Sequence, residues 1–212
     1  MGGLARDITA QREANERQTL LLRELNHRVK NTLALILSMA RQTGLRVADV
    51  ADFMNTFEGR VEALAAAHGL LTESGWRSTP LPTLIEAALA AHDERRIRVS
   101  VEELPSPPAA AQDLVLILHE LATNAAKHGA LSVPGGTVLV HGSRSGGGLL
   151  LCWHEAGGPP VGPPIEPGFG TTLLEQVVAH RHEGSVDLDW RPDGLVCTIR
   201  LPLGAQADRS GG

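Results

Sequence analysis

One histidine of the first predicted helix is placed where its imidazole can do chemistry. His27 lies two residues from both Leu25 and Val29, so at about 100° per residue it points nearly opposite the apolar stripe of that helix. An exposed neutral imidazole can act as a nucleophile, because its ring nitrogen attacks without first losing a proton. Asn31, one turn further on, can orient a water against a group bound at His27. The competing interpretation of a lone exposed histidine is an ordinary solvated side chain.

A second group of polar side chains falls on one face of a helix predicted over 112–129, and the opposite face is apolar. A carboxylate can act as a base, an amide oxygen can ligate Mg²⁺, and a lysine can neutralise phosphate. The pattern fits a nucleotide site, although a plain amphipathic helix with a solvated face has the same spacing. The polar residues are Glu120, Asn124, Lys127 and His128.

Glycines and prolines fill the segment between a strand that ends at 153–155 and a helix that begins near Thr171. Glycine permits close approach of the backbone to a ligand, and a helix N-terminus attracts phosphate. A buried Glu155 can accept a hydrogen bond from an exocyclic amine such as that of adenine. The segment is too long and irregular for a hairpin turn, which favours a mobile lid. Its glycines include Gly157, Gly158, Gly168 and Gly170.

Two long helices are needed to position His27. Residues 16–43 contain no Gly or Pro and carry apolar residues at alternating steps of three and four, and a second helix is predicted from about Val50. Gly44 is expected to end the first helix. Each helix of such a hairpin covers only one stripe, so two hairpins from two chains would complete a four-helix bundle. The pattern therefore predicts a homodimer.

The rest of the chain predicts helices packed on one face of a sheet, an α+β fold. Prolines at 80 and 82 open a helix, and 103–110 reads as a proline-rich loop. Alternation of apolar and polar residues marks the strands. The expected strands are 97–101, 137–142, 149–155, 185–190 and 195–202, and the expected helices are 82–92, 112–129 and 171–182.

Composition narrows the possible classes of protein. The chain has 212 residues, a net charge of -5 and 42% hydrophobic residues, which suits one or two globular domains and gives no support for nucleic-acid binding. No apolar run approaches the length of a bilayer span, and the beginning lacks the apolar core of a signal peptide, so the predicted location is cytoplasmic. Cys152 and Cys197 are predicted to be reduced core thiols rather than a disulfide.

Four blocks of this sequence, in order, resemble the HWE subfamily of bacterial sensor histidine kinases. The resemblance covers nearly the whole chain, from about Leu20 to Leu203, and four ordered blocks make coincidence a poor explanation. The blocks are ELNHRVKNTLALILSMARQT at 24–43 for the phosphoacceptor box, LHELATNAAKHGALS at 118–132 for the N box, WHEAGGPPV at 153–161 with the W-x-E of the family, and GFGTTLLEQVV at 168–178 for the second glycine box.

The resemblance implies a role for each matched residue. It makes His27 the phosphoacceptor, Glu120 a candidate base and Asn124 the Mg²⁺ ligand, and it places Lys127 and His128 near the phosphates. Glu155 takes the place of the aspartate that binds adenine in most other histidine kinases. The lid and the phosphate contacts would come from Gly157, Gly158, Gly168, Gly170 and Thr171.

The resemblance also implies a fold and an activity. The fold is a helical dimerisation hairpin followed by a Bergerat-type (GHKL) α/β sandwich. The activity is binding of Mg-ATP, autophosphorylation of His27 and transfer to an aspartate of a response regulator receiver domain. The expected parts are a linker at 1–15 that resembles the exit of an upstream PAS-type sensor, a hairpin domain at 16–77, a catalytic domain at 78–204 and a disordered tail at 205–212.

One departure from the wider group leaves a second function open. Arg28 follows His27, where the major class of histidine kinases has an acid that polarises the histidine; Glu24, one turn earlier, can serve instead. The alternative is a weak pseudokinase or phosphotransfer scaffold that docks response regulators. A metal-dependent hydrolase is disfavoured. His180 and His182 would be its candidate ligands, but side chains two residues apart on a helix point about 200° apart. A related ATPase or Ser/Thr-directed kinase would not need the His27 hairpin.

Overall fold

The computed structural model describes residues 23, 29–45, 49–162, 169–174, 177–179 and 182–202. The chain divides into two compact units, Met1–Phe57 and Glu58–Gly212. This division falls inside helix α2 (Val50–Glu73) and therefore marks no linker, so the domain boundaries expected from the sequence stay predictions. The predicted linker at 1–15 and tail at 205–212 lie outside the described residues.

The first unit contains the two helical segments of a hairpin. Residues 29–44 are helical, and α2 begins at Val50, as the apolar periodicity predicted. The two segments approach each other at Gly44, where a Cβ would lie 3.7 Å from the ring of Phe53. The rings of Phe53 and Phe57 stack with centroids 5.6 Å apart, so one face of α2 offers a continuous aromatic surface at this point.

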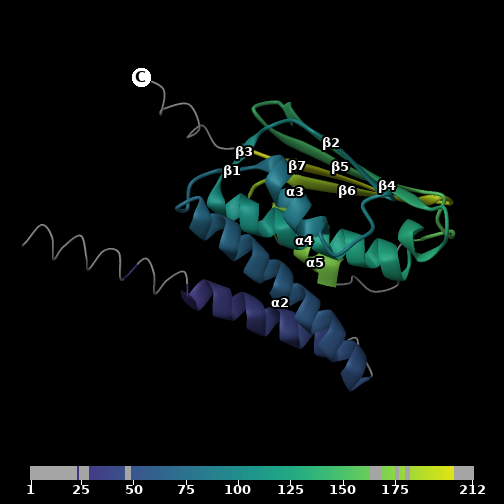
Figure 1. The fold of residues 1–212 in the computed structure, drawn as a ribbon, viewed down its shortest axis with the longest axis horizontal. Coiled ribbons are helices and arrows are strands. Elements are labelled where there is room, and N and C mark those ends of the chain that lie inside the picture. Colours follow the sequence, from purple (N-terminus) through teal and green to yellow (C-terminus); the bar gives the residue numbers. More distant parts are fainter. Residues whose placement is uncertain are drawn as a thin grey trace, which may run out of the picture. The chain divides into compact units, whose positions relative to one another are not determined.

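The second unit is a sheet with helices on one face (Figure 1). The strand order is β2-β4-β5-β7-β6; β2 runs parallel to β4, and the other neighbours are antiparallel. Helix α3 (Leu81–Leu89) and helix α4 (Pro108–Lys127) cover the inner face. The strands are β2 (Ile97–Val101), β4 (Thr137–Ser145), β5 (Gly148–Ala156), β6 (Ser185–Arg191) and β7 (Gly194–Leu201), and each overlaps a strand expected from the sequence.

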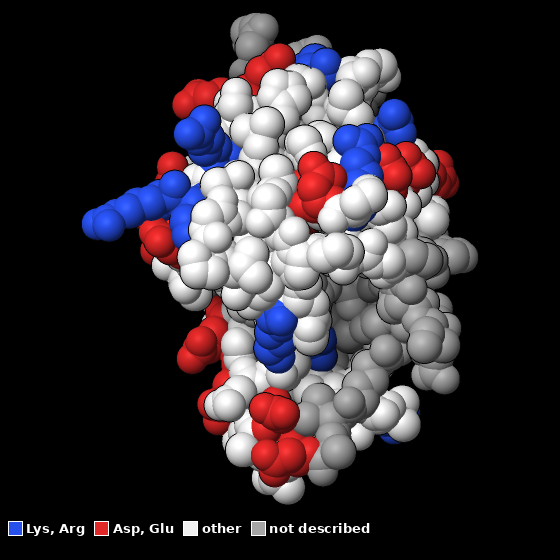
Figure 2. Space-filling view, turned by 90° about the vertical axis from the view of Figure 1, so that its right-hand side faces the viewer, with Lys and Arg blue, Asp and Glu red and all other residues white. Residues whose placement is uncertain are grey.

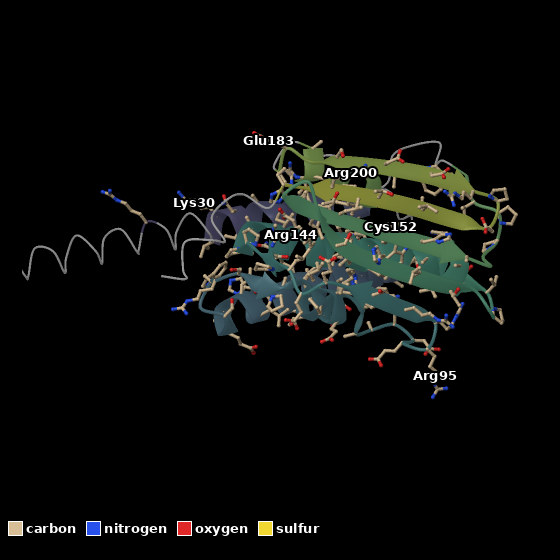
Figure 3. The ribbon with its side chains drawn as sticks, turned by 90° about the horizontal axis from the view of Figure 1, so that it is seen from above. Lys30, Arg95, Arg144, Cys152, Glu183 and Arg200 are labelled. Carbon is tan, nitrogen blue, oxygen red and sulfur yellow. The ribbon has the colours of Figure 1, made fainter. Side chains whose placement is uncertain are left out.

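The core of this unit lies between the sheet and α4. Alternate residues of β5 point inward, and Leu149, Leu151 and Trp153 are almost fully buried. The outer face of the sheet is open to solvent, as Figure 3 shows with Arg144, Cys152 and Arg200. Both cysteines are free, and Cys197 is a core thiol whose pKa burial raises to about 12. Cys152 is only half-buried, so the prediction of a core position is wrong for this residue.

Several element boundaries differ from the sequence-based expectations. Helix α4 begins at Pro108, inside the expected loop, because proline is well suited to the first helical position. Two short strands were missed, β1 (Thr79–Pro80) and β3 (Pro105–Ser106), which pair antiparallel. The expected helix at 171–182 is α5 (Phe169–Leu174) with a π-helical turn at 177–179; 175–176 and 180–181 are not described.

Two observations concern membrane-spanning helices and the charge of the surface. None of the helices among the described residues is long and apolar enough to cross a membrane. Figure 2 shows acidic and basic side chains interspersed over the face in view. On this face, charges of both signs are mixed rather than gathered into one basic patch.

Replacing Gly69 with alanine is expected to stabilise the protein. Gly69 is an exposed residue inside α2, and a Cβ there would meet nothing within 4 Å. A glycine in a helix interior costs about 1 kcal/mol relative to alanine, so urea unfolding of Gly69→Ala should show a gain of that size. Gly75, just past the helix with φ of 62°, is the matched control: Gly75→Ala should lose about 1–2 kcal/mol. Equal effects of the two changes would contradict the argument.

Candidate functional site

The last turns of α4 carry the predicted polar residues. Asn124, Lys127 and His128 are exposed, as predicted. Glu120 is only 5% exposed, so the prediction that it shares their solvated face is wrong. Helix α2 lies against α4 at this point, because a Cβ on Gly59 would lie 3.5 Å from Nε2 of His119, the residue that precedes Glu120.

The buried Glu120 is held by an arginine that the sequence analysis missed. Nε of Arg60 donates to Oε1 of Glu120 at 2.6 Å, and Nη2 donates to Oε2 at 2.9 Å. Arg60 is itself only 7% exposed, and this two-point geometry is the strong form of an arginine–carboxylate pair. Both oxygens of the candidate base are therefore engaged in this arrangement.

The second glycine segment lies directly on this end of α4. Gly170 is buried, and a Cβ there would lie 3.2 Å from Nδ2 of Asn124 and 3.6 Å from Cβ of Glu120. A side chain at 170 would thus press on the exposed amide. Two segments that are about 50 residues apart in sequence meet at this point, which supports their predicted place in one site. The backbone of Thr171 continues α5, whereas Gly168 lies outside the described residues.

A buried carboxylate at the end of β5 forms the third part of the site. Glu155 is 3% exposed; its Oε2 accepts from the N–H of Ala130 at 2.8 Å, and its Oε1 accepts from Nε1 of Trp153 at 3.2 Å. Burial raises the pKa of Glu155, and the two hydrogen bonds oppose that rise. These contacts give a physical reason for the W-x-E spacing, since the indole holds the carboxylate two residues on. A Cβ on Gly129 would overlap Oε2 of Glu155.

The first glycine pair, Gly157 and Gly158, lies beside the backbone of Ala130. Gly157 has φ of 70°, and a Cβ on Gly158 would lie 2.7 Å from Cα of Ala130. The N–H of Gly158 donates to the carbonyl of Asp193 at 3.2 Å. Glycine is therefore required at 158 for close packing and favoured at 157 by its backbone conformation.

The remaining predicted site residues belong to the first unit or are not described. His27 and Glu24 fall outside the described residues. Asn31 is exposed on the helical segment 29–44 of the first unit. In the described part of the chain, no three His, Cys, Asp or Glu side chains are grouped to hold a metal ion. Nε2 of His182 lies 2.8 Å from Oδ2 of Asp113 on α4, so this histidine has a structural partner.

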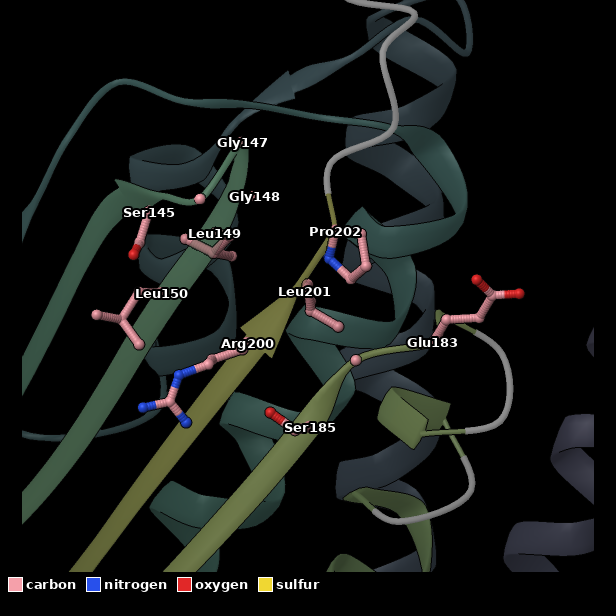
Figure 4. Close-up of a pocket in the computed structure, with 12 residues that line it drawn as sticks. Ser145, Gly147, Gly148, Leu149, Leu150, Glu183, Ser185, Arg200, Leu201 and Pro202 are labelled. Carbon is pink, nitrogen blue, oxygen red and sulfur yellow. The ribbon is translucent and has the colours of Figure 1, made fainter.

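A hollow of about 420 Å³ at the other end of the sheet is separate from the candidate site (Figure 4). It lies where β4 turns into β5 at Gly146 and Gly147, beside Arg200 and Pro202. None of the predicted site residues lines it.

Two neighbouring histidines are expected to make the protein sensitive to acid. The rings of His92 and His119 lie 6.5 Å apart. Burial lowers the pKa of both histidines below 6.5. The pKa of His119 is lowered further by His92 and Arg60, whereas Glu120 and Glu62 raise it. The folded state then binds fewer protons than the unfolded state, so stability is complete above about pH 6.5 and is lost as pH falls toward the folded pKa values.

This pH dependence can be measured by urea unfolding at pH 7.5, 6.0 and 5.0. Each histidine changes the free energy of unfolding by at most about 1.4 kcal/mol per pH unit. His119→Gln should flatten the dependence, and the double replacement with His92→Gln should flatten it further. A parent and a double variant with equal slopes would contradict the argument.

Comparison with known proteins gives the class of this fold. The histidine kinase domain of a blue-light-activated histidine kinase of Erythrobacter litoralis superposes with a TM-score of 0.63 at 22% identity, over 81% of this chain and 85% of that chain. The helices over one face of a mixed sheet are therefore the fold of a histidine kinase catalytic domain, α+β of the GHKL type, as predicted.

Sequence comparison gives the known proteins that this chain resembles. Residues 24–103 match the model of the HWE histidine kinase family. A blue-light-activated histidine kinase of Brucella anthropi is 36% identical over 96% of this chain and 43% of its own length. A blue-light-activated histidine kinase of Erythrobacter litoralis is 35% identical over 93% of this chain and 57% of its own length. The chain is therefore similar to the HWE histidine kinases, and it spans about half the length of these curated relatives.

Proposed function

We propose that this chain is the core of a sensor histidine kinase that binds Mg-ATP, phosphorylates His27 and passes the phosphoryl group to an aspartate of a response regulator. One observation carries the proposal: three segments that are distant in sequence converge beside the C-terminal end of α4. They supply a buried acceptor and closely packed glycine backbone beside the exposed amide of Asn124 on α4. The segments are 129–136, 155–158 and 169–174.

Glu155 is proposed to recognise the adenine. An ionised carboxylate has about four lone-pair positions, and the N–H groups of Ala130 and Trp153 use two of them. Acceptor capacity therefore remains for the exocyclic amine of the base. Gly157 and Gly158 have no side chains that would keep a planar base away from the backbone.

Asn124 is proposed to hold Mg²⁺, with Lys127, His128, Gly168, Gly170 and Thr171 around the phosphates. Mg²⁺ usually keeps several waters and takes one or two protein oxygens besides those of the substrate phosphates. A single exposed amide beside buried Gly170 fits that requirement without a cluster of carboxylates. Bound Mg²⁺ supplies neutralisation of the phosphate charge.

Transfer then needs the histidine and a base. A ring nitrogen of His27 forms a bond to the γ-phosphorus while the bond from that phosphorus to the bridging oxygen breaks, and ADP leaves. Glu24 or Glu120 is proposed to take the ring proton, and Asn31 to orient a water beside the product. In the described arrangement, Glu120 can act only after its carboxylate leaves Arg60. An aspartate of the receiver domain then accepts the phosphoryl group and restores His27.

A second copy of the chain is the proposed partner of the hairpin. Val29, Leu33 and Leu37 follow one another at steps of four on the helical segment 29–44 and are 47%, 54% and 61% exposed. Large apolar side chains in such a row indicate a surface that another helix covers. An upstream sensor domain is proposed for the full-length protein, since the chain spans only part of its relatives.

The alternative function is a scaffold that docks response regulators without using ATP. Two observations favour it: Arg28 stands where an acid is usual, and Arg60 engages both oxygens of Glu120. Failure of the parent protein to bind Mg-ATP would support this function.

Calorimetry with Mg-ATP tests the proposed site. The parent should bind with a dissociation constant between roughly 1 μM and 1 mM. Asn124→Ala should weaken binding at least about tenfold, because the metal loses its protein ligand. Asn55→Ala, which removes an exposed amide of α2 that has no proposed role, is the matched control and should bind as the parent does. Unchanged binding by Asn124→Ala would contradict the assignment of the metal ligand.

A further inference from the structure

Arg96 holds the segment that follows α4 through an unusually dense set of hydrogen bonds. Its guanidinium makes five contacts, all to main-chain carbonyls of 130–136. Nε donates to Gly136 at 2.9 Å, Nη1 to Leu131 at 3.0 Å, and Nη2 to Ala130 at 3.0 Å, to Val133 at 2.6 Å and to Gly136 at 2.8 Å.

The main chain of Arg96 is fixed as well. Its N–H donates to the carbonyl of Asp93 at 3.0 Å, and its carbonyl accepts from the N–H of Val138 at the start of β4 at 2.9 Å. The guanidinium is therefore anchored at the edge of the sheet before it reaches the segment. A planar group with five N–H donors can satisfy several carbonyls at once, whereas a lysine donates from a single nitrogen.

The segment that Arg96 holds presents one donor to the candidate site. Ala130 is fully buried; its N–H donates to Oε2 of Glu155, and its carbonyl accepts from Arg96. A Cβ on Gly158 would lie 2.7 Å from Cα of Ala130, so Ala130 has no room to move toward Gly158. The position of the Ala130 N–H is thus set by Arg96 on one side and by close packing on the other.

We propose that Arg96 is a positioning residue that sets the preference of the site for adenine over a 6-oxo purine. The inference rests on the proposed nucleotide function. Fixing the Ala130 N–H fixes one oxygen of Glu155, which leaves the remaining acceptor positions aimed in one direction. A 6-amino group donates to such an acceptor, whereas a 6-oxo group brings a second acceptor against it, which is unfavourable. Arg96 touches neither base nor phosphate and acts only through Ala130 and Glu155.

The test compares dissociation constants for Mg-ATP and Mg-ITP, which differ at the 6-position of the base. Arg96→Lys keeps the positive charge and removes the planar set of N–H donors. It should weaken ATP binding about tenfold and leave the dissociation constant for ITP within about threefold of the parent value. The ratio of the two constants then falls toward one. A purely structural role would weaken both nucleotides equally and leave the ratio unchanged. Arg95→Lys is the matched control, because Arg95 is the exposed neighbour whose side chain projects away from the sheet (Figure 3).

A second comparison keeps the proposal testable if Arg96→Lys is also less stable. In a Glu155→Gln background, Arg96→Lys should change the ATP/ITP ratio by less than about twofold, because its route of action has been removed. A parent-like ratio in Arg96→Lys, or an equal fall of the ratio in the Glu155→Gln background, would overturn the proposal. Failure of the proposed function gives a different result, since the parent would then bind neither nucleotide.

Discussion

Replacing Arg60 with methionine is expected to cost about 3–5 kcal/mol of unfolding free energy, because it leaves Glu120 buried without its partner. Both residues are less than a tenth exposed, and the carboxylate accepts two hydrogen bonds from the guanidinium. Water cannot replace those bonds without opening the contact between α2 and α4. Urea unfolding followed by circular dichroism measures the loss directly.

Two further variants separate a buried charge from lost packing. The double change Arg60→Met with Glu120→Gln should recover most of the loss, because no unpaired charge is left inside. Arg191→Met is the matched control: Arg191 and Asp189 pair at 2.7 Å, but their side chains are about half exposed. That change should cost at most about 1 kcal/mol. A loss of under 1 kcal/mol for Arg60→Met would show that the buried pair does not form in solution.

Adding one methyl group at Gly129 is expected to weaken ATP binding about 10- to 100-fold, the range of one hydrogen bond to a charged group. The φ of Gly129 is -106°, which any residue can adopt, so the obstacle is space. The new Cβ would overlap Oε2 of Glu155 and lie 2.9 Å from Cα of Ala125. Helix backbone does not yield easily, so the carboxylate must move.

The prediction at Gly129 has a rescue and a control. Shortening the acid in Gly129→Ala with Glu155→Asp should recover part of the affinity, because the carboxylate retreats from the new methyl group. Gly135→Ala places a methyl group in the same segment at φ of 89° with nothing within 4 Å. It should lower stability through backbone strain and change ATP affinity less than about threefold. Parent-like ATP binding by Gly129→Ala would contradict the proposed role of Glu155.

The fold was predictable from the sequence wherever one periodicity governs an element. The start of α2 at Val50 and the strands of the sheet follow from steps of three and four or from strict alternation. The start of α4 was missed because Pro108 looks like a loop residue, although it suits the first turn of a helix. Strands β1 and β3 are too short for an alternation of apolar and polar residues to reveal them.

The site was predictable in its residue types but not in its contacts. Spacing on α4 placed Glu120 with Asn124 on one face, yet it does not reveal that α2 covers the Glu120 end of that face. A signal was present, because Arg60 stands three residues after Phe57 and four before Leu64, within the apolar stripe of α2. A charge in such a stripe predicts a buried partner. The contribution of Arg96 has no signature in the sequence, since all four of its acceptors are main-chain carbonyls.

The measurement that tests the central claim most directly is autophosphorylation with γ-labelled ATP, comparing the parent protein with His27→Gln. The parent is expected to take up label that is lost in acid and stable in base, as a phosphohistidine is, and the variant should take up none. A parent that binds Mg-ATP but remains unlabelled, or a variant that labels equally well, would contradict the assignment of His27 as the phosphoacceptor of an active kinase.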